Sequence, residues 1–323
     1  MRSMILAACF GTRLRPITYT LPKPLVPVRN KPLIAYAVEN YLRAGVDEIV
    51  VNLHHFPDLI ERYLTSTFDC GFHFSREEKI LGTGGALRPV RALLEPQGEF
   101  FLVNGDTIQS PPFDALLRAR RERGALAALT LRHPPANDRF TPVYFEDGLI
   151  TGFGSSGEQA PRLSGRGDEP RSALDVDRRG RLSSTGQGEA LMFTGAHAIS
   201  ADIFDRLPDQ EVFSIIDDVY KNVPLAGVID DGPWFDIGTP ERYLEASGGT
   251  TVGARSVIDG TLNNTVVWDD CRIGHGVVLN DCIVAHGVEL NEPIEITRAI
   301  ICRDDAAIPP EYNREIGVVV SRF

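Results

Sequence analysis

Short apolar segments alternate with amphipathic segments through the first 122 residues of the chain. The apolar segments predict strands at residues 3–8, 48–53, 71–75 and 100–103. The segments between them have apolar residues at helical spacing and predict helices at 32–44, 57–64 and 84–94, with a fourth helix ending near residue 122. This alternation favours a mostly parallel sheet with helices on both faces, in which ligands bind at the carboxyl ends of the strands.

A different pattern begins after residue 250. Between Thr251 and Cys302, short β-branched pairs are separated by Gly, Asn and Asp. Two series of apolar residues have a spacing of six: Val267, Ile273 and Leu279, and then Val278, Val284 and Leu290. Repeats of six with small turn residues are typical of a hexapeptide β-helix, and an irregular β-sandwich is the alternative.

Residues 154–190 match neither pattern. They contain few large apolar side chains and many Gly, Ser, Arg and Asp residues. A loop of this length is either functional or mobile, and its composition fits both.

Charged residues are unevenly distributed along the 323-residue chain. The formal net charge of −11 argues against a general nucleic-acid binder. Residues 1–43 nevertheless contain seven basic residues and one acidic residue, so this segment carries +6 and the remaining 280 residues carry −17. A cationic segment in an acidic protein suggests a local site for an anion.

Nothing in the sequence predicts export or insertion into a membrane. The apolar run Met4–Phe10 is too short for a signal peptide or a spanning helix. The five cysteines are an odd number without a C-x-x-C pair, so neither a disulfide framework nor a zinc site is expected. We therefore expect a cytoplasmic protein without a membrane partner.

Several N-terminal cations lie in a loop that follows the first predicted strand. Gly11 allows a tight turn there, Arg13, Arg15 and Lys23 supply positive charge, and four prolines limit the flexibility of the loop. A bound triphosphate needs backbone N–H groups close to its oxygens and cations that neutralise charge at the reacting phosphorus. The loop is neither a P-loop nor a dinucleotide fingerprint, because both glycine patterns are missing.

The order of the motifs resembles that of the sugar-1-phosphate nucleotidyltransferases, also called nucleoside-diphosphate-sugar pyrophosphorylases. Residues 7–18 (AACFGTRLRPIT), followed by Lys23-Pro24, are similar to the signature of that family, A-A-G-x-G-T-R-L-x-P-(L/I)-T and then K-P. Four later segments resemble further family motifs: LGTGGAL at 81–87, VNGD at 103–106, FTG at 193–195 and WFDIGTP at 234–240. The resemblance lies nearest to the mannose- and heptose-1-phosphate guanylyltransferases, and several family members carry a C-terminal left-handed β-helix.

The resemblance implies an α/β fold. A Rossmann-like, mostly parallel-sheet nucleotidyltransferase domain is expected over residues 1–247, followed by a small left-handed β-helix domain with a C-terminal tail over residues 248–323. The implied activity is Mg²⁺-dependent transfer of a nucleotidyl group from a nucleoside triphosphate to a sugar 1-phosphate, with release of pyrophosphate. GTP with mannose or heptose 1-phosphate is the expected pair, and uridylyl or thymidylyl transfer stays open. A phosphate oxygen of the sugar phosphate is the nucleophile, so no protein nucleophile is needed.

The same resemblance assigns roles to individual residues. Arg13, Lys23 and Asp106 are expected to be catalytic, with Arg13 at the leaving pyrophosphate and Lys23 at the phosphates near the attack. Asp106 and Asp236 are expected to hold Mg²⁺, a hard cation that keeps several waters. The expected nucleotide contacts are Leu6, Ala8, Cys9, Gly11, Thr12, Arg13, Gly82 and Thr83, where the glycines of 82–85 would leave room for the nucleobase. The expected sugar-phosphate contacts are Gly105, Glu189, Thr194 and Gly195.

The chain departs from the family pattern at two places. Cys9 stands where the family has Gly, and a Cβ there would cost about 1 to 2 kcal/mol if the position needs a positive φ, but little if φ is negative. The Glu-Lys pair that many members place before the sugar-side strand is not recognisable in residues 154–190, although Glu189 lies near.

Two other functions compete with catalysis of nucleotidyl transfer. Cys9 favours a catalytically impaired homologue that binds nucleotide sugars and regulates a partner through its β-helix. His275 and His286 would be candidate bases of an acyltransferase, although the hexad region is short for that activity. A homo-oligomer is expected, because the edge and sides of a β-helix commonly serve for association.

Overall fold

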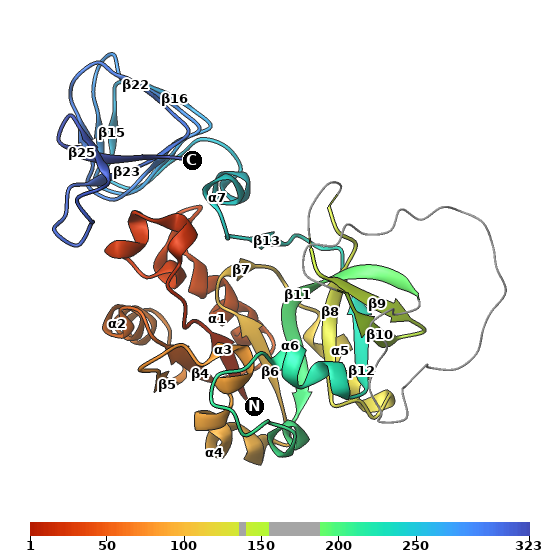
Figure 1. Ribbon diagram of the computed structural model, residues 1–323. Coiled ribbons are helices and arrows are strands. Elements are labelled where there is room, and N and C mark those ends of the chain that lie inside the picture. Colours follow the sequence, from red (N-terminus) through yellow and green to blue (C-terminus); the bar gives the residue numbers. More distant parts are fainter. Residues whose placement is uncertain (136–139, 155–187) are drawn as a thin grey trace, which may run out of the picture.

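The computed structural model describes residues 1–135, 140–154 and 188–323, so most of the predicted loop at 154–190 lies outside the described residues. Figure 1 shows a nine-stranded sheet covered by helices and, beside it, a prism of short strands. The strand order of the large sheet is β5-β4-β1-β6-β11-β8-β12-β10-β9. Among the described residues, no helix is long and apolar enough to cross a lipid bilayer.

The first half of the large sheet follows the predicted alternation of strands and helices. The strands of the whole sheet are β1 (Arg2–Leu6), β4 (Glu48–Leu53), β5 (Gly71–Arg76), β6 (Glu99–Asn104), β8 (Ala127–Arg132), β9 (Pro142–Glu146), β10 (Leu149–Phe153), β11 (Glu189–Ser200) and β12 (Leu225–Ile229). The helices are α1 (Leu33–Arg43), α2 (Pro57–Thr67), α3 (Gly82–Gly85), α4 (Arg91–Leu94), α5 (Phe113–Glu122), α6 (Ile215–Asp218) and α7 (Pro240–Ser247). The four predicted strands and three of the four predicted helices are confirmed.

The continuous helix predicted at 84–94 is wrong. The segment is divided into α3, a 3-10 turn at Arg88–Val90 and α4. Pro89 lies in the turn, where its ring and its missing N–H oppose a regular α-helix.

The sheet is mixed, and the prediction of a mostly parallel sheet is therefore wrong for its second half. Parallel pairs join β5 to β4, β4 to β1, β1 to β6 and β8 to β12, whereas β11 is antiparallel to β6, β8 and β9. β9 and β10 form an antiparallel hairpin whose turn contains Asp147 and Gly148, both with positive φ. A turn this short allows only antiparallel pairing, because a parallel pair needs a long crossover.

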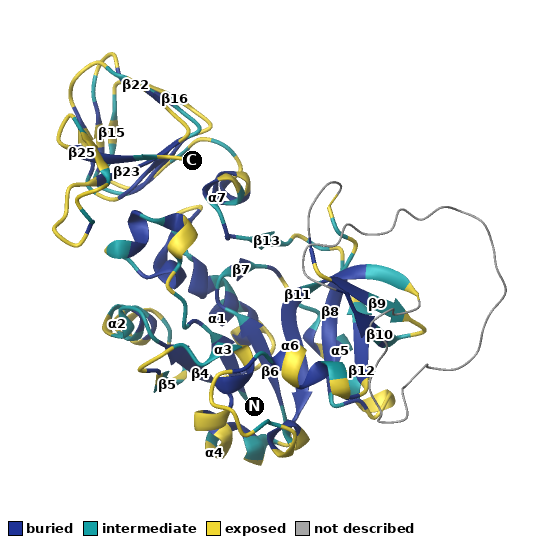
Figure 2. Cartoon of the chain, in the orientation of Figure 1, coloured by how far each residue is buried: buried dark blue, intermediate teal, exposed yellow. Residues whose placement is uncertain are grey.

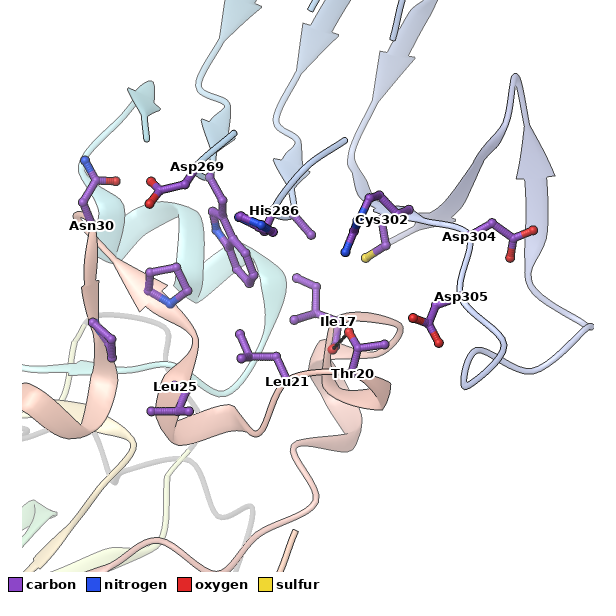
Figure 3. A pocket seen from close by; sticks show the side chains of 15 residues that line it. Ile17, Thr20, Leu21, Leu25, Asn30, Asp269, His286, Cys302, Asp304 and Asp305 are labelled. Carbon is purple, nitrogen blue, oxygen red and sulfur yellow. Dashed lines mark hydrogen bonds between the residues drawn. The ribbon is translucent and has the colours of Figure 1, made fainter. Parts of the chain in front are cut away.

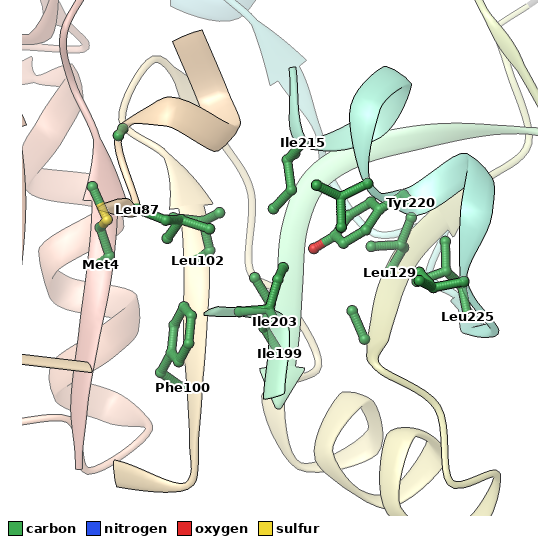
Figure 4. Close-up of a cluster of buried hydrophobic side chains, with 14 of the residues drawn as sticks. Met4, Leu87, Phe100, Leu102, Leu129, Ile199, Ile203, Ile215, Tyr220 and Leu225 are labelled. Carbon is green, nitrogen blue, oxygen red and sulfur yellow. The ribbon is translucent and has the colours of Figure 1, made fainter. Parts of the chain in front are cut away.

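Side chains of the central strands alternate between two hydrophobic cores, as a period of two requires. Met4, Phe100 and Leu102 face one core, and Ile5, Phe101 and Val103 face the other. The first core is closed by residues of the short helical segments: Leu94 of α4, and Leu87, Ile203, Ile215 and Tyr220, which Figure 4 shows. The second core is closed by residues of α1, α2 and α5, namely Tyr41, Ile60, Leu64, Phe113 and Leu116. Figure 2 shows the resulting buried sheet between partly exposed helices.

Residues after α7 form a three-sided stack of short parallel strands, here called the coil. One side is β14 (Thr251–Val252), β17 (Val266–Val267), β20 (Ile283–Val284) and β23 (Ala299–Arg303). The second side is β15 (Val257–Ile258), β18 (Arg272–Ile273) and β21 (Glu289–Leu290), and the third is β16 (Thr261–Asn263), β19 (Val278–Asn280) and β22 (Glu295–Thr297). An antiparallel hairpin of β24 (Asn313–Glu315) and β25 (Val318–Arg322) extends the first side.

The spacing of six corresponds to successive sides of the coil. Val267, Ile273 and Leu279 are at most 1 % exposed and fill its interior. In the second series Val278 is half-buried, because it is the neighbouring Leu279 that points inward. Parallel strands on three sides are not the arrangement of a β-sandwich, so that alternative is wrong. The left-handedness of the coil and the domain limits 1–247 and 248–323 stay predictions.

The loop after β1 is packed between the large sheet and the coil. Leu14, Ile17 and Val26 share one hydrophobic core with Trp268 and Ile300 of the coil. Hydrogen bonds reinforce this contact, since the Trp268 Nε1 donates to the Tyr243 hydroxyl over 2.8 Å, and that hydroxyl donates to the Pro27 carbonyl over 2.5 Å. The loop is therefore supported from two directions.

Candidate active site

The carboxyl ends of β5, β4, β1 and β6 lie side by side in this order. Asn52 on β4 and Asn104 on β6 are both opposite Leu6 in the strand register. The cationic loop leaves β1 between them, and Asp106 follows β6 after a single glycine. The sheet thus gathers the predicted residues at the edge where ligands of parallel sheets bind.

The loop that carries the signature, residues 7–25, is here called the signature loop. It consists of three 3-10 turns at Thr12–Leu14, Ile17–Tyr19 and Lys23–Leu25. The first turn begins after Gly11, which has a φ of 61° and whose carbonyl accepts from the Leu14 N–H and the Thr18 hydroxyl. A Cβ on Gly11 would lie 2.9 Å from both Thr18 Cγ2 and Lys23 Cβ. Glycine is required at this position for conformation and for space.

Lys23 and Asp106 form an ion pair at the base of the site. The Lys23 Nζ lies 2.6 Å from the Asp106 Oδ2. The Lys23 side chain is 6 % exposed and the Asp106 side chain 31 % exposed, so the ammonium is held inside while the carboxylate faces the opening. Two residues that the sequence places 83 positions apart are thus brought into contact.

A cavity of about 320 Å³ opens above this pair. Its size is at the lower end of ligand sites. It is lined by seven predicted residues, Ala8, Cys9, Gly11, Thr12, Arg13, Lys23 and Asp106, and by Phe10, Leu14, Ile80 and Gly238. Leu6, also predicted to contact nucleotide, is the last residue of β1 and is not part of the lining.

Cys9 adopts an ordinary backbone conformation, because its φ is not positive. Burial raises the pKa of its thiol to about 11, and the neighbouring Asp106 carboxylate acts in the same direction. The thiol is therefore neutral at physiological pH. The left-handed conformation that favours glycine is at Gly11, and the backbone of Cys9 is unstrained.

Asp236 approaches the site from a separate two-stranded ribbon. Asp236 lies on β13 (Phe235–Asp236) and is opposite Thr107 of β7 (Thr107–Ile108), so it is brought next to the strand that follows Asp106. Its Oδ2 lies 3.2 Å from the Arg242 Nη1. A Cβ on Gly238 would meet both the Arg13 guanidinium at 2.9 Å and the Asp236 carboxylate at 3.0 Å, so these two groups reach the same point.

The two predicted metal ligands fit a magnesium ion that is shared with phosphate. Both side chains are about 30 % exposed, at 31 % for Asp106 and 28 % for Asp236. Within residues 1–135, 140–154 and 188–323, no cluster of three or more His, Cys, Asp or Glu side chains is arranged for a metal. Mg²⁺ is often held by one or two carboxylates with phosphates and waters, so this donor set suits it.

Glycines 82–85 pack against the segment at residue 213. A Cβ on Gly82 would lie 2.6 Å from the Phe213 carbonyl oxygen, and one on Gly84 would lie 2.4 Å from the Phe213 ring. The Gly84 and Gly85 N–H groups both donate to that carbonyl. The side on which a Cβ would stand is therefore filled by the segment at 213, and a contact of Gly82 or Thr83 with nucleotide stays a prediction. Thr83 is exposed, and its hydroxyl accepts from the Ile215 N–H over 3.0 Å.

The predicted sugar side lies where β11 passes β6. Gly195 has a φ of 92°, and a Cβ there would lie 2.5 Å from the Asn104 Nδ2. Gly105 donates its N–H to the Leu6 carbonyl over 2.8 Å. Thr194 is 3 % exposed and its carbonyl accepts from the Trp234 Nε1, while its buried hydroxyl has no hydrogen-bond partner among the described residues. The motifs FTG and VNGD are therefore neighbours in space.

Glu189 is not brought to this group. It begins β11 and is five residues of extended strand from Thr194, roughly 16 Å. Its carboxylate lies 2.9 Å from the His133 Nε2, and the other ring nitrogen of His133 lies 2.7 Å from Asp231. Hydrogen bonds to the two carboxylates raise the pKa of His133.

Sequence reasoning missed several residues at the site. Ile80 lines the cavity, and Asn52 and Glu77 form a buried hydrogen bond behind it. Asn52 could have been suspected, because it is a polar residue in the otherwise apolar end of the strand EIVVNL. Glu77 lies among other charged residues, REEK, and no pattern distinguishes it.

A second cavity, of about 550 Å³, lies between the signature loop and the coil (Figure 3). Ile17, Leu21 and Leu25 form one wall, and Trp268 and Cys302 form the other. His286 borders it, whereas His275 is not among its lining residues. The side chains of these two histidines are 57 % and 90 % exposed.

Known proteins match the chain in sequence and fold. The family described as Nucleotidyl transferase matches residues 2–153. A probable mannose-1-phosphate guanylyltransferase 2 from Oryza sativa subsp. japonica is 26% identical over 305 residues, which cover 85% of this chain and 74% of the relative. A mannose-1-phosphate guanyltransferase from Gibberella zeae is 38% identical over 257 residues, which cover 76% of this chain and 63% of the relative.

Solved structures share the α/β fold. HddC from Yersinia pseudotuberculosis, in a crystal structure titled as a complex with GMP-PN, aligns with a TM-score of 0.59 and 21% identity over 76% of this chain and 97% of that one. A putative glucose-1-phosphate thymidylyltransferase from Bacillus anthracis aligns with a TM-score of 0.59 and 19% identity over 76% of this chain and 94% of that one. The sequence matches, together with the signature loop and its ion pair, support the predicted relation to the sugar-1-phosphate nucleotidyltransferases, and the solved structures show that the fold is shared.

Proposed function

We propose that the protein transfers a nucleotidyl group from a nucleoside triphosphate to a sugar 1-phosphate. A phosphate oxygen of the sugar phosphate attacks the α-phosphorus of the triphosphate, and the bond from that phosphorus to the oxygen bridging to the β-phosphate breaks. The products are a nucleoside-diphosphate sugar and pyrophosphate. The reaction needs positioning and charge neutralisation and no protein nucleophile.

The observation that carries this proposal is the convergence of Arg13, Lys23 and Asp106 on one cavity with the signature-loop backbone. Lys23 is fixed by its 2.6 Å contact with Asp106, so its ammonium is positioned before the substrates bind. A preorganised cation in a partly buried site stabilises developing phosphate charge more than one in water does. Arg13 is exposed at the mouth of the cavity, where it suits the leaving pyrophosphate.

Magnesium is part of the proposal. Asp106 and Asp236 would hold the ion, which would neutralise phosphate charge when bound. Asp106 then has two partners, since it also fixes Lys23. Among the described residues at the site, the cations Lys23, Arg13 and Arg242 flank these two carboxylates, so the acidic and basic groups of the site alternate.

Guanylyl transfer to mannose or heptose 1-phosphate is the favoured pairing. The mannose-1-phosphate guanylyltransferases of Oryza sativa and Gibberella zeae support this choice, and the structure titled as a complex with GMP-PN is consistent with a guanine nucleotide. Uridylyl and thymidylyl transfer are tested in the same experiment. A homo-oligomer and a cytoplasmic location stay predictions.

Pyrophosphate release should be measured over a matrix of four nucleoside triphosphates and several sugar 1-phosphates, with and without Mg²⁺. We expect turnover for one nucleotide with a small set of sugars, and none without a divalent cation. A protein that binds a nucleotide sugar and releases no pyrophosphate with any pair would refute the proposal.

That negative outcome would instead support the impaired regulatory homologue. Cys9 was the sequence feature in favour of it, and the unstrained backbone and neutral thiol at that position weaken the argument. Acyl transfer has less support, because His275 and His286 are exposed histidines next to different aspartates, Asp259 at 3.9 Å and Asp270 at 3.5 Å.

A further inference from the structure

Two buried polar side chains connect the signature loop to the loop that precedes Gly82. We infer that Asn52 and Glu77 are positioning residues, which hold these two loops at the separation that the nucleotide requires. This inference rests on the proposed function, because it assigns the two loops to one nucleotide site.

The connection is a continuous chain of hydrogen bonds. The Ala7 N–H donates to the Asn52 Oδ1 over 2.8 Å, and the Asn52 Nδ2 donates to the Glu77 Oε1 over 2.8 Å. The second carboxylate oxygen of Glu77, Oε2, accepts from the Leu81 N–H over 2.9 Å. Both ends of the chain are backbone groups, so it fixes the path of the main chain at Ala7 and at Leu81.

These two ends adjoin the proposed nucleotide site. Ala7 directly precedes Ala8, the first cavity-lining residue of the signature loop. Leu81 directly follows Ile80, which lines the same cavity, and it directly precedes Gly82. A change in the Asn52–Glu77 contact would therefore move two walls of one cavity relative to each other.

Burial indicates that the pair is not a general surface contact. Asn52 is 3 % exposed and Glu77 is 8 % exposed. A buried carboxylate loses hydration, and apolar residues of similar volume often stabilise a fold equally well or better. Stability alone thus does not require these polar groups, whereas control of two backbone positions does. The Glu77 N–H also donates to the Leu53 carbonyl over 2.7 Å, which anchors Glu77 at the end of β4.

The donor and acceptor pattern of these hydrogen bonds allows the amide at position 52 and the carboxylate at position 77 to be exchanged. In Glu77→Gln the new amide cannot accept from both Asn52 and Leu81, so one bond is lost. In Asn52→Asp a carboxylate would face the Glu77 carboxylate. In the double variant Asn52→Asp/Glu77→Gln, the acid at 52 accepts from Ala7 and from the amide at 77, and the amide oxygen accepts from Leu81. The double variant restores all three bonds and the net charge.

The test compares the wild type with the two single variants and the double variant. We expect each single variant to raise the KM for the nucleoside triphosphate about tenfold, as loss of one buried hydrogen bond would do. kcat and the KM for the sugar phosphate should change less than about threefold, and the double variant should return to within about threefold of the wild type. Single variants with unchanged nucleotide KM, or a double variant no better than the singles, would overturn the inference.

A matched control separates positioning from stability. Tyr41 is fully buried, and its hydroxyl donates to the Met4 carbonyl over 2.6 Å. Met4 is on β1, the strand that leads to Ala7, and neither Tyr41 nor Met4 lines the cavity. Tyr41→Phe should lower the melting temperature and leave the nucleotide KM unchanged. If Tyr41→Phe raised that KM as much as Glu77→Gln, the effect of Glu77→Gln would be one of stability.

Calorimetric binding of GTP by the same proteins distinguishes this inference from the proposed function. If the wild type binds nucleotide without turnover, the proposed function fails and the order of affinities still tests the positioning role. If turnover is present and the affinities do not follow the hydrogen-bond pattern, the positioning role alone fails. A wild type that neither binds nor turns over nucleotide would overturn both.

Discussion

The two sides of the proposed active site are constructed differently. The nucleotide side is the signature loop with Lys23 and Asp106, and it combines a nearly buried ion pair with a glycine at φ 61°. The predicted sugar side is the part of β11 with Thr194 and Gly195, whereas Glu189, at the start of that strand, lies away from them and pairs with His133, whose side chain is 52 % exposed. The first is held by the ion pair and by the three turns of its loop, while in the second Thr194 and Gly195 are buried and solvent reaches the Glu189 end of the strand.

This difference follows from what each side must do. The triphosphate is the same in every nucleotide, so its site can be rigid and can rely on backbone and buried charge. Sugars differ in their hydroxyl groups, so their recognition depends on exposed side chains that can vary without unfolding the protein. We therefore expect changes on the nucleotide side to affect turnover most.

The largest effect is expected for Lys23→Met, which keeps the bulk of the side chain and removes its charge. kcat/KM should fall on the order of a thousandfold, because the ammonium would no longer neutralise phosphate charge. Steady-state kinetics at saturating Mg²⁺ provide the measurement. Lys31→Met is the control, since Lys31 pairs with Glu39 at 2.8 Å outside the cavity and should change the rate less than about twofold. Equal rates for Lys23→Met and the wild type would show that the Lys23 ammonium does not contribute to turnover.

A smaller effect is expected for Asp236→Asn. Asp236 adjoins both the nucleotide side and the sugar side. kcat should fall about a hundredfold and the Mg²⁺ concentration at half-maximal rate should rise at least tenfold, because one of two carboxylate ligands would be lost. Mg²⁺ titration of the rate measures both. The exposed Asp231, which contacts His133, offers the control Asp231→Asn. An unchanged titration curve for Asp236→Asn would show that Asp236 does not hold the metal.

The rigidity of the nucleotide side can be tested at Gly11. Gly11→Ala should lower kcat/KM at least tenfold and the free energy of unfolding by about 1 to 2 kcal/mol, because the new Cβ would push on Thr18 and Lys23 in a left-handed conformation. Gly45→Ala has similar backbone strain at φ 73° with nothing within 4 Å, so it should affect unfolding but not the rate.

Cys9→Gly should change kcat/KM less than about threefold. If Cys9→Gly were the more active protein by tenfold or more, the glycine demand would lie at Cys9 after all.

The smallest effect is expected at the Glu189 end of β11, in the pH dependence of stability. The pKa of His133 is raised, so its attraction to Glu189 and Asp231 is fully present below its ordinary pKa of about 6.5 and is lost as the pH rises through the raised value. Melting temperatures of the wild type and His133→Gln, measured from pH 5 to 9, should differ by less than about 3 °C at low pH and converge at high pH. A difference in melting temperature that grows with pH would contradict the stabilising attraction between charged His133 and the two carboxylates.

Much of the nucleotide side was predictable from the sequence because its groups are close in the chain or follow a strand directly. Arg13 and Lys23 are part of one loop, and Asp106 follows β6, so knowledge of a parallel sheet suffices to bring them together. The contact between Lys23 and Asp106 itself needed the structure, since no pattern specifies which cation meets which carboxylate.

The failures have a common cause, which is that a partner distant in sequence decides the local structure. At Gly82 and Gly84, nothing in the sequence indicates that Phe213 fills the space where a Cβ would stand. Glu189 is close in sequence to Thr194, but an extended strand separates their side chains. The second half of the sheet is mixed: β9 and β10 turn back at Asp147 and Gly148, and β11 runs antiparallel to β6 and β8, although β8 and β12 are parallel. The direction of each strand in the sheet cannot be predicted from its own residues.

The shared core under the signature loop sets a limit on how the protein can be shortened. Leu14, Ile17, Val26 and Leu33 pack against the coil through Trp268, Ile283 and Ile300. A recombinant fragment ending at residue 247 would place this apolar surface in water, where it would promote self-association. A shortened form of this chain would need polar replacements on that surface, chosen so that the three turns of the signature loop keep their path.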